Sequence, residues 1–300
     1  MSQLFSPTLA SAAVARASAT RSGAALVVEG GAMRGIFACG VLDSFHEHGF
    51  QPFSLAIGCS VGACLLASHL AEQRGRNRLV FTKYMTRKEF IDPRRFLRGG
   101  HWLDFDWLWQ ATERDVPIDR AKLAASAVKL VLSATSYATG QPVYLEPTDS
   151  DLMLSLKSSC ALPILCRDPV HVADQRLMDG GIAAPIPVQE AYRRGARRIV
   201  VIRSRPPEFV KRASAFAGLS ALAFRTSPSF ARALRRAHDA YAEAVAFIRS
   251  PPADCEILHV APTAVLATGR TTQDVRALDR DYALGRDAGT RAIAAWGCCP

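Results

Sequence analysis

A serine flanked by two glycines carries the strongest chemical signal in the sequence. The run Gly58-Cys59-Ser60-Val61-Gly62 matches G-x-S-x-G and stands between an apolar run and a helical pattern. A tight strand-to-helix turn needs glycine where a Cβ would clash, and it presents the serine hydroxyl at a helix N-terminus, where negative charge is stabilised. We expect Ser60 to be a nucleophile and Gly58 and Gly62 to shape its turn. The alternative is a purely structural turn.

A second glycine-rich turn precedes this one. Its sequence GGAMRG fits neither the phosphate loop G-x-x-x-x-G-K-[ST] nor the dinucleotide pattern G-x-G-x-x-G. Neighbouring turns of a parallel sheet lie close together, so its backbone N–H groups could hold the oxyanion that forms at Ser60. We expect glycine-only backbone angles at Gly31, and Arg34 either adds positive charge or lies on a helix surface. The expected oxyanion hole comprises Gly30, Gly31, Ala32, Met33, Arg34 and Gly35.

An aspartate followed by two glycines is the third motif. Asp179-Gly180-Gly181 follows a short apolar strand, and Asp-Gly is also a common tight-turn dipeptide. A carboxylate with a pKa of about 4 is a weak base for a hydroxyl, but burial raises that pKa. We expect Asp179 to be the base for Ser60, with Gly180 and Gly181 packing closely around it.

A histidine could instead complete a triad. His238 and His259 follow Ser60 and Asp179 in the chain order of an α/β-hydrolase, and His171 lies in a short strand. Each is also explained by a surface or core role, because His238 lies in an arginine-rich helix and the other two lie in strands.

The elements around the motifs alternate between strand and helix. Residues 25–30 and 53–58 are short apolar runs, and each is followed by a helical pattern, at 33–49 and 61–75. This alternation predicts a parallel sheet with helices on its faces. Further strands are expected at 128–134, 143–145, 170–173, 176–178, 198–203 and 255–261, and further helices at 151–161, 188–195, 209–249 with a break near 227, and 272–296.

The three motifs in this order resemble the patatin-like phospholipase family. The segment SSCALP at 158–163 is similar to that family as well, and the resemblance covers about residues 24–203. It implies an α/β fold, a three-layer α/β/α sandwich with a mainly parallel sheet. It also implies a Ser60–Asp179 dyad and an oxyanion hole at the glycine-rich turn. Val61 departs from the family pattern, where a smaller residue commonly follows the serine, and this could narrow the neighbouring pocket.

Composition divides the chain into three parts. Residues 1–23 are rich in Ala and Ser without an acidic residue, so we expect a disordered N-terminal tail, with a transit peptide as the alternative. Residues 24–207 form the expected patatin-like hydrolase domain. Residues 208–300 form a mostly helical C-terminal extension packed on the core, similar to that of a bacterial subgroup of the family.

Several classes of protein are disfavoured by the pattern. No stretch reaches the roughly 18–20 apolar residues of a membrane-spanning helix. Eight scattered cysteines without CxxC indicate reduced thiols in a cytoplasmic protein, and without HExxH we expect neither a metal nor another cofactor. Residues 102–109 are aromatic and either line an acyl groove or belong to the core.

The formal net charge of +10 includes a basic stretch at 203–236. Phe224, Phe230 and Leu234 alternate there with Arg225, Arg232, Arg235 and Arg236. This pattern fits an interfacial helix on an anionic membrane, such as the inner membrane surface, and equally a helix whose apolar side faces the core. We expect no nucleic-acid partner, and the oligomeric state is open.

The expected activity is hydrolysis of a glycerolipid or other acyl ester, of the phospholipase A or lysophospholipase type. An acyltransferase or thioesterase would use the same serine. A basic lipid-binding adaptor without turnover is the alternative from another class, and its motifs would be free to decay, yet all three are intact.

Overall fold

The first strand, β1 (Ala24–Val28), is buried on both faces of a central sheet. Leu26 and Val28 lie in one apolar core and Val27 in another, because successive side chains of a strand point to opposite faces. The computed structural model describes residues 23–98, 102–163, 168–213, 224 and 226–298. All but the last residue of the expected tail, 1–23, lies outside these residues.

The described strands form one eight-stranded sheet in the order β5-β6-β3-β2-β1-β7-β8, with β4 paired to β3. From β3 to β8 the neighbours in this order run parallel, whereas β4, β5 and β6 pair antiparallel. The further strands are β2 (Leu55–Cys59), β3 (Lys129–Ser136), β4 (Pro142–Leu145), β5 (Val170–Val172), β6 (Gln175–Asp179), β7 (Arg198–Ile202) and β8 (Glu256–Val260). The turns after β1 and β2 lie at the carboxyl ends of adjacent parallel strands, where sites in such sheets form.

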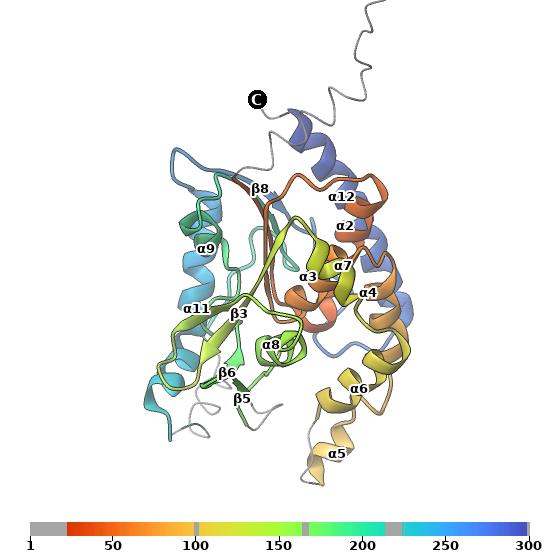
Figure 1. Ribbon diagram of the computed structural model, residues 1–300, viewed down its shortest axis with the longest axis vertical. Coiled ribbons are helices and arrows are strands. Elements are labelled where there is room, and N and C mark those ends of the chain that lie inside the picture. Colours follow the sequence, from red (N-terminus) through yellow and green to blue (C-terminus); the bar gives the residue numbers. More distant parts are fainter. Residues whose placement is uncertain (1–22, 99–101, 164–167, 214–223, 225, 299–300) are drawn as a thin grey trace, which may run out of the picture.

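Helices cover both faces of the sheet, as Figure 1 shows. One face carries α9 (Val188–Arg193) and α11 (Pro228–Arg249). The other carries a larger group with its own core: η1 (Ala32–Gly35), α2 (Ile36–Glu47), α3 (Val61–Leu70), α4 (Arg76–Leu79), the π-helix η2 (Val80–Tyr84), α6 (Phe105–Asp115), α7 (Arg120–Ala125), α8 (Leu152–Ser159) and α12 (Val275–Cys298). The short α5 (Pro93–Leu97) lies beyond α6. The fold is therefore a three-layer α/β/α sandwich with a mainly parallel sheet, as the resemblance implied.

The C-terminal residues 208–300 contribute to all three layers, since α11 covers one face of the sheet. β8 extends the sheet beside β7, and α12 packs on α2. At this helix contact a Cβ on Gly285 would overlap the Phe37 carbonyl, and one on Gly40 would overlap the Tyr282 carbonyl. The two helices can approach this closely only because both positions are glycine. The C-terminal helix is thereby fixed to the first helix of the fold.

The structure distinguishes the two interpretations of the basic stretch. Phe230 and Leu234 on α11 are buried against Tyr137, so the apolar side of this helix faces the core. Arg232, Arg235 and Arg236 are exposed, whereas Arg203 is fully buried and Arg225 lies outside the described residues. The helix begins at Pro228, and residues 209–213 are not helical. The interfacial-helix hypothesis is wrong for α11, because its apolar residues are not available to a membrane.

Candidate active site

Ser60 occupies a strained turn between β2 and α3. Its backbone angles are φ 53° and ψ −128°, and its side chain is nearly buried. A positive φ is unfavourable for a residue other than glycine and tends to occur where a site needs it. Gly62 permits the turn, since a Cβ there would lie 2.5 Å from the Val28 carbonyl oxygen. Gly58 lies within β2 one residue before the turn.

The strained turn directs the Ser60 hydroxyl toward Asp179. The hydroxyl donates a hydrogen bond to Oδ2 of Asp179 at 2.7 Å. The other carboxylate oxygen, Oδ1, accepts the backbone N–H of Gly181 at 2.7 Å, and the Gly180 N–H donates to the Ser159 carbonyl. Asp179 is the last residue of β6, so the sheet brings together two of the three sequence motifs.

Burial makes Asp179 a stronger base than an exposed aspartate. Loss of solvation raises its pKa from 3.8 to about 6, while the hydrogen bonds from Ser60 and Gly181 and the charges of Arg270 and Lys211 oppose the shift. With that pKa the carboxylate is still mostly ionised at pH 7, and its affinity for a proton is higher than that of an exposed aspartate. This is the condition under which a carboxylate can assist a serine hydroxyl.

Two polar side chains that sequence analysis did not single out hold this pair in place. The Ser159 hydroxyl accepts the Ser60 N–H at 2.9 Å and donates to the Ser133 carbonyl at 2.7 Å. The Thr135 hydroxyl donates to the Asp179 carbonyl at 2.8 Å. Ser159 lies in the SSCALP segment, which was noticed only as a family feature. Thr135 lies in an ordinary strand pattern that gave no signal.

The glycine-rich turn lies beside Ser60, and its N–H groups divide into two sets. Met33 donates to the Arg270 carbonyl at 3.3 Å and Arg34 donates to the Gly31 carbonyl at 3.2 Å. Within the described part of the chain, the N–H groups of Gly31 and Ala32 have no acceptor. These two are therefore the donors that an oxyanion could still use. Gly30 packs against Ser60 and Cys59, and Gly35 against Val61.

Gly31 does not have the positive φ that most favours glycine, because its φ is −154° and its ψ is 4°. Space restricts this position, since a Cβ would lie 2.7 Å from the buried Ser204 hydroxyl. That hydroxyl donates to the carboxylate of Glu29, a buried residue that directly follows β1. Positive φ occurs instead at Ala32, with a value of 50°.

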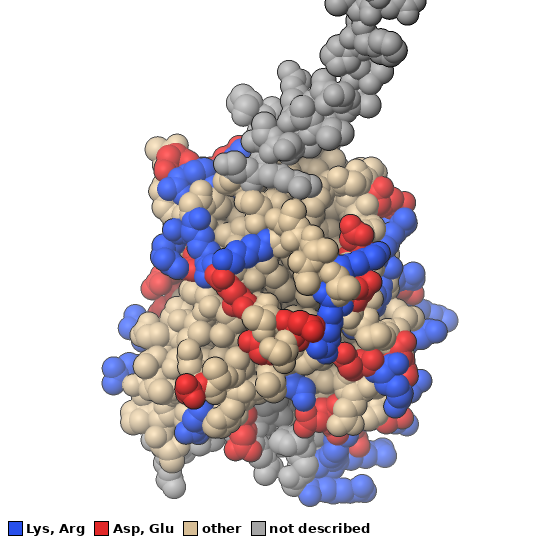
Figure 2. All heavy atoms as spheres, viewed as in Figure 1, with Lys and Arg blue, Asp and Glu red and all other residues tan. Residues whose placement is uncertain are grey.

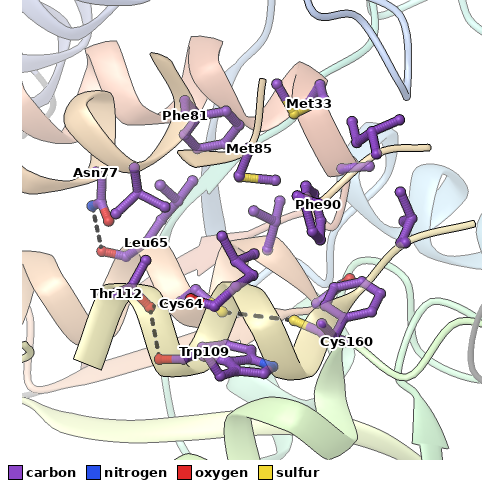
Figure 3. A pocket seen from close by; sticks show the side chains of 18 of the residues that line it. Met33, Cys64, Leu65, Asn77, Phe81, Met85, Phe90, Trp109, Thr112 and Cys160 are labelled. Atoms are coloured by element: carbon purple, nitrogen blue, oxygen red, sulfur yellow. Dashed lines mark hydrogen bonds between the residues drawn. The ribbon is translucent and has the colours of Figure 1, made fainter. Parts of the chain in front are cut away.

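Ser60 opens onto an apolar pocket with an empty volume of about 890 Å³, its open mouth included. Figure 3 shows side chains from α3, η2 and α6 converging on it, among them Leu65, Phe81 and Trp109. Of the aromatic segment 102–109, Phe105 and Trp109 line the pocket, while Trp102 and Trp107 pack against the core. Both interpretations of that segment therefore apply, each to different residues.

Two cysteines lie on the pocket wall near the nucleophile. Sγ of Cys64 on α3 is 3.6 Å from Sγ of Cys160, just after α8 (Figure 3). All five cysteines whose side chains the structure describes are free thiols. The contact with Cys64, followed by burial, raises the pKa of Cys160, and burial raises the pKa of Cys59. At these positions the thiols act as small apolar side chains.

None of the three histidines considered as a third member of a triad contacts Ser60 or Asp179. His238 lies on α11, with Nδ1 3.1 Å from the Arg235 carbonyl, and His259 in β8 contacts Arg203 at 3.4 Å. Burial, followed by the charge of Arg203, lowers the pKa of His259 to about 4. His171 is exposed in β5. Of the four side chains weighed as a base, only Asp179 is hydrogen-bonded to Ser60 among the described residues.

Comparison with known proteins shows the family of the chain. The model of the patatin-like phospholipase family matches residues 26–192, which is more than half of the chain. The chain belongs to the patatin-like phospholipase family. It is 36% identical over 282 residues to a protein of Escherichia coli (strain K12) named "Uncharacterized protein YjjU", and the match covers 91% of this chain and 78% of that protein.

Two further similarities are found outside this family assignment. A solved structure, the crystal structure of VipD from Legionella pneumophila, aligns with a TM-score of 0.45 at 14% identity, covering 91% of this chain and 67% of that one. The model of a domain of unknown function, DUF6363, matches residues 227–298. Those residues include α11, β8 and α12, which follow the part matched by the patatin-like model.

The described residues contain no group of three or more His, Cys, Asp or Glu side chains that could hold a metal ion. None of the described helices combines the length and the apolar character that crossing a bilayer requires.

Proposed function

We propose that this member of the patatin-like family is a serine-dependent lipid acyl hydrolase that cleaves a carboxylic ester of a glycerolipid, as a phospholipase A or lysophospholipase does. One observation carries the proposal. The Ser60 hydroxyl is hydrogen-bonded to a buried carboxylate at 2.7 Å and faces an apolar pocket. A nucleophile, a base and space for an acyl chain thus occur together.

In the proposed first half-reaction, Ser60 Oγ attacks the ester carbonyl carbon while Asp179 takes the hydroxyl proton. The carbonyl oxygen becomes an oxyanion, for which Gly31 and Ala32 have unpaired N–H groups. Each such donor commonly contributes about 3 kcal/mol to transition-state stabilisation. The tetrahedral intermediate then expels the alcohol, which receives the proton from Asp179, and the acyl group stays on Ser60.

The second half-reaction frees the enzyme. Water attacks the acyl carbon, Asp179 accepts a proton from that water, and the bond to Ser60 breaks as the proton passes to Oγ. The products are a fatty acid and free enzyme. An alcohol acceptor in place of water would make the protein an acyltransferase, and a thioester donor would make it a thioesterase, because the acyl-enzyme is the same.

A basic cluster beside the pocket supports contact with an anionic membrane. Lys83, Arg87, Lys88, Arg94 and Arg98 are exposed and have no ion-pair partner among the described residues. Figure 2 shows Lys and Arg gathered at the lower right, around α5. The same segment supplies Met85, Phe90 and Ile91 to the pocket wall. A cationic surface next to the pocket would hold the enzyme where its lipid substrate is extracted.

The test is labelling by a fluorophosphonate, which reacts with activated serines. Wild type should be labelled and should release fatty acid from a phospholipid, with ¹⁸O from labelled water in that acid. Ser60→Ala should lose both signals, whereas Ser150→Ala, a change at an exposed serine, should keep them. Labelling that persists in Ser60→Ala would refute the proposal, and acyl transfer to added alcohol without hydrolysis would favour the acyltransferase.

A further inference from the structure

The segment between β8 and α12 reaches the proposed oxyanion turn. The Arg270 carbonyl accepts the Met33 N–H at 3.3 Å, and Arg270 lines the same pocket as Ser60. All other wall residues of that pocket lie between 32 and 162. The C-terminal part of the chain therefore places one charged side chain at the site.

This segment is anchored to the fold on both sides of Arg270. The buried carboxylate of Asp281 on α12 accepts the N–H groups of Ala267 at 3.3 Å and Thr268 at 2.7 Å. The side-chain amide of Gln273 donates to the Thr86 carbonyl at 2.9 Å. Because α12 is itself packed closely on α2, the backbone at Arg270 has a defined place beside the site.

Other cations lie near Arg270 and lack a carboxylate partner. Arg34 is only 7% exposed, and its buried Nε has no hydrogen-bond partner. Burial, Arg205 and Arg270 together lower the pKa of Arg34 to about 10, and burial and Arg270 lower that of Lys211. Neither Arg34, Arg270 nor Lys211 forms an ion pair within the described part of the chain.

The nearby acidic groups are already engaged. Asp179 accepts hydrogen bonds from Ser60 and Gly181, and Glu29 accepts the N–H of Ser204 at 2.6 Å. Arg34 is buried whereas Arg270 is exposed, so water screens part of their repulsion, and an anion that joins them lowers the Coulomb energy that remains. The site thus has an excess of positive charge next to the proposed nucleophile.

We propose that Arg270, with Arg34 beside it, binds the phosphate of the substrate head group while the apolar pocket takes the acyl chain. The inference rests on the proposed function, because it assigns the substrate's phosphate a place next to Ser60. A guanidinium can donate two parallel hydrogen bonds to a phosphate. Anionic glycerophospholipids would thereby be preferred over neutral glycerolipids of the same acyl chain.

The test compares two short-chain substrates that stay monomeric in water, a lysophosphatidic acid and the monoacylglycerol with the same acyl group. Wild type should favour the phosphate-bearing substrate in kcat/KM. In Arg270→Gln the ratio of the two kcat/KM values should fall by about tenfold, the loss expected for a charge-assisted contact. Arg270→Lys should recover part of it, and Arg280→Gln, an exposed arginine on α12, should keep the wild-type ratio. An unchanged ratio in Arg270→Gln would overturn the proposal.

A binding measurement separates this proposal from the proposed function. Glycerol 3-phosphate, inorganic phosphate and glycerol are titrated into the full-length Ser60→Ala protein, with and without Arg270→Gln. Binding of glycerol 3-phosphate that depends on Arg270 would support the phosphate subsite. If wild type nevertheless hydrolysed neither substrate, that result would contradict the proposed hydrolase activity and leave the subsite supported. Equally tight binding of inorganic phosphate, with an unchanged kcat/KM ratio, would identify a free-anion site and refute a head-group role. Absence of Arg270-dependent binding would refute the subsite.

Discussion

The Ser60 hydroxyl and the Asp179 carboxylate are hydrogen-bonded at 2.7 Å although 119 positions separate them in sequence. Ser60 follows β2 and Asp179 ends β6, and β3 pairs with both strands. The register of the sheet sets Cys59 beside Ser133 of the parallel strand β3, and Asp179 of the antiparallel strand β6 beside the next residue, Ala134, so Ser60 and Asp179 lie at the same level of the sheet. The pair is therefore a product of sheet topology, and its chemistry depends on the burial that the sheet imposes.

The first prediction concerns the ionisation of Asp179. As a base it must be unprotonated, and burial raises its pKa to about 6. We expect kcat/KM for a soluble nitrophenyl ester to rise with pH through about 6 and then to level off, as the active fraction rises. Asp179→Asn should lower the plateau by roughly 10²–10⁴-fold, the usual contribution of a general base. A wild-type-like rate in Asp179→Asn, or an equal loss in His259→Ala, would contradict the dyad.

The second prediction concerns stability. The folded-state pKa of Asp179 lies above the ordinary value of 3.8, so the folded protein binds more protons than the unfolded chain between about pH 4 and pH 6. This carboxyl therefore destabilises the fold as pH rises through that window. Asp179→Asn removes the buried charge and should raise the free energy of unfolding by about 3 kcal/mol at pH 7, because the shift is about 2 pKa units and each unit is worth about 1.4 kcal/mol.

Denaturant unfolding at pH 4 and pH 7 tests this prediction. The gain of Asp179→Asn should appear at pH 7 and largely disappear at pH 4, where the wild-type carboxyl is mostly protonated in the folded state. Asp174→Asn, in the exposed turn between β5 and β6, is the control and should show no such pH dependence. A variant less stable than wild type at pH 7 would show that the ionised carboxylate's hydrogen bonds outweigh its burial.

The sequence predicted those parts of the site that depend on local pattern. Turn residues around Ser60 and Asp179, the strands before them and the layer architecture followed from glycine spacing, apolar runs and family resemblance. Long-range contacts were not predictable in the same way. Nothing near Arg270 indicates that its carbonyl meets Met33, because that contact depends on how α12 packs on α2. The pairing of β8 with β7 was missed for the same reason.

Composition alone misjudged where charged residues lie. The basic stretch 203–236 includes Arg203, which is fully buried and donates to the Tyr241 hydroxyl at 2.7 Å. A local count of cations cannot separate such a residue from exposed Arg232. The sequence did not predict a role for the basic cluster at 83–98. Its position beside the pocket follows only from the fold, in which Met85 and Phe90 point into the pocket.

The third prediction concerns the glycine-rich turn. Gly31→Ala should lower kcat more than it raises KM, because the added Cβ meets Ser204 at 2.7 Å and displaces the N–H groups that face the developing oxyanion. The expected loss is about 10²-fold in kcat, as for removal of one oxyanion donor. Steady-state kinetics on the nitrophenyl ester provide the measurement. Gly195→Ala controls for general loss of stability, because this turn has a φ of +95° that strains an alanine although the added Cβ contacts nothing. A raised KM with unchanged kcat would instead indicate a role in substrate binding.

The fourth prediction separates the two basic regions of the surface. Changing Lys83, Arg87 and Lys88 together to glutamine should weaken binding to anionic liposomes, because these cations are exposed beside the pocket and form no ion pair with any described carboxylate. Changing Arg232, Arg235 and Arg236 to glutamine removes the same charge from α11 and serves as the matched control. That triple variant should bind like wild type, since the apolar side of α11 is buried in the core and cannot insert into a bilayer.

Cosedimentation with vesicles of phosphatidylglycerol in phosphatidylcholine, repeated over a salt series, provides the measurement. Each cation near an anionic surface contributes about 1 kcal/mol at low salt, so three should change the partition coefficient by roughly 10²-fold. The residual binding of the 83–88 variant should depend less on salt, because fewer charges remain to be screened. Hydrolysis of phospholipid in vesicles should fall with binding, while cleavage of the soluble ester should not. Equal losses in both triple variants would mean that net charge, and not the surface beside the pocket, governs the contact.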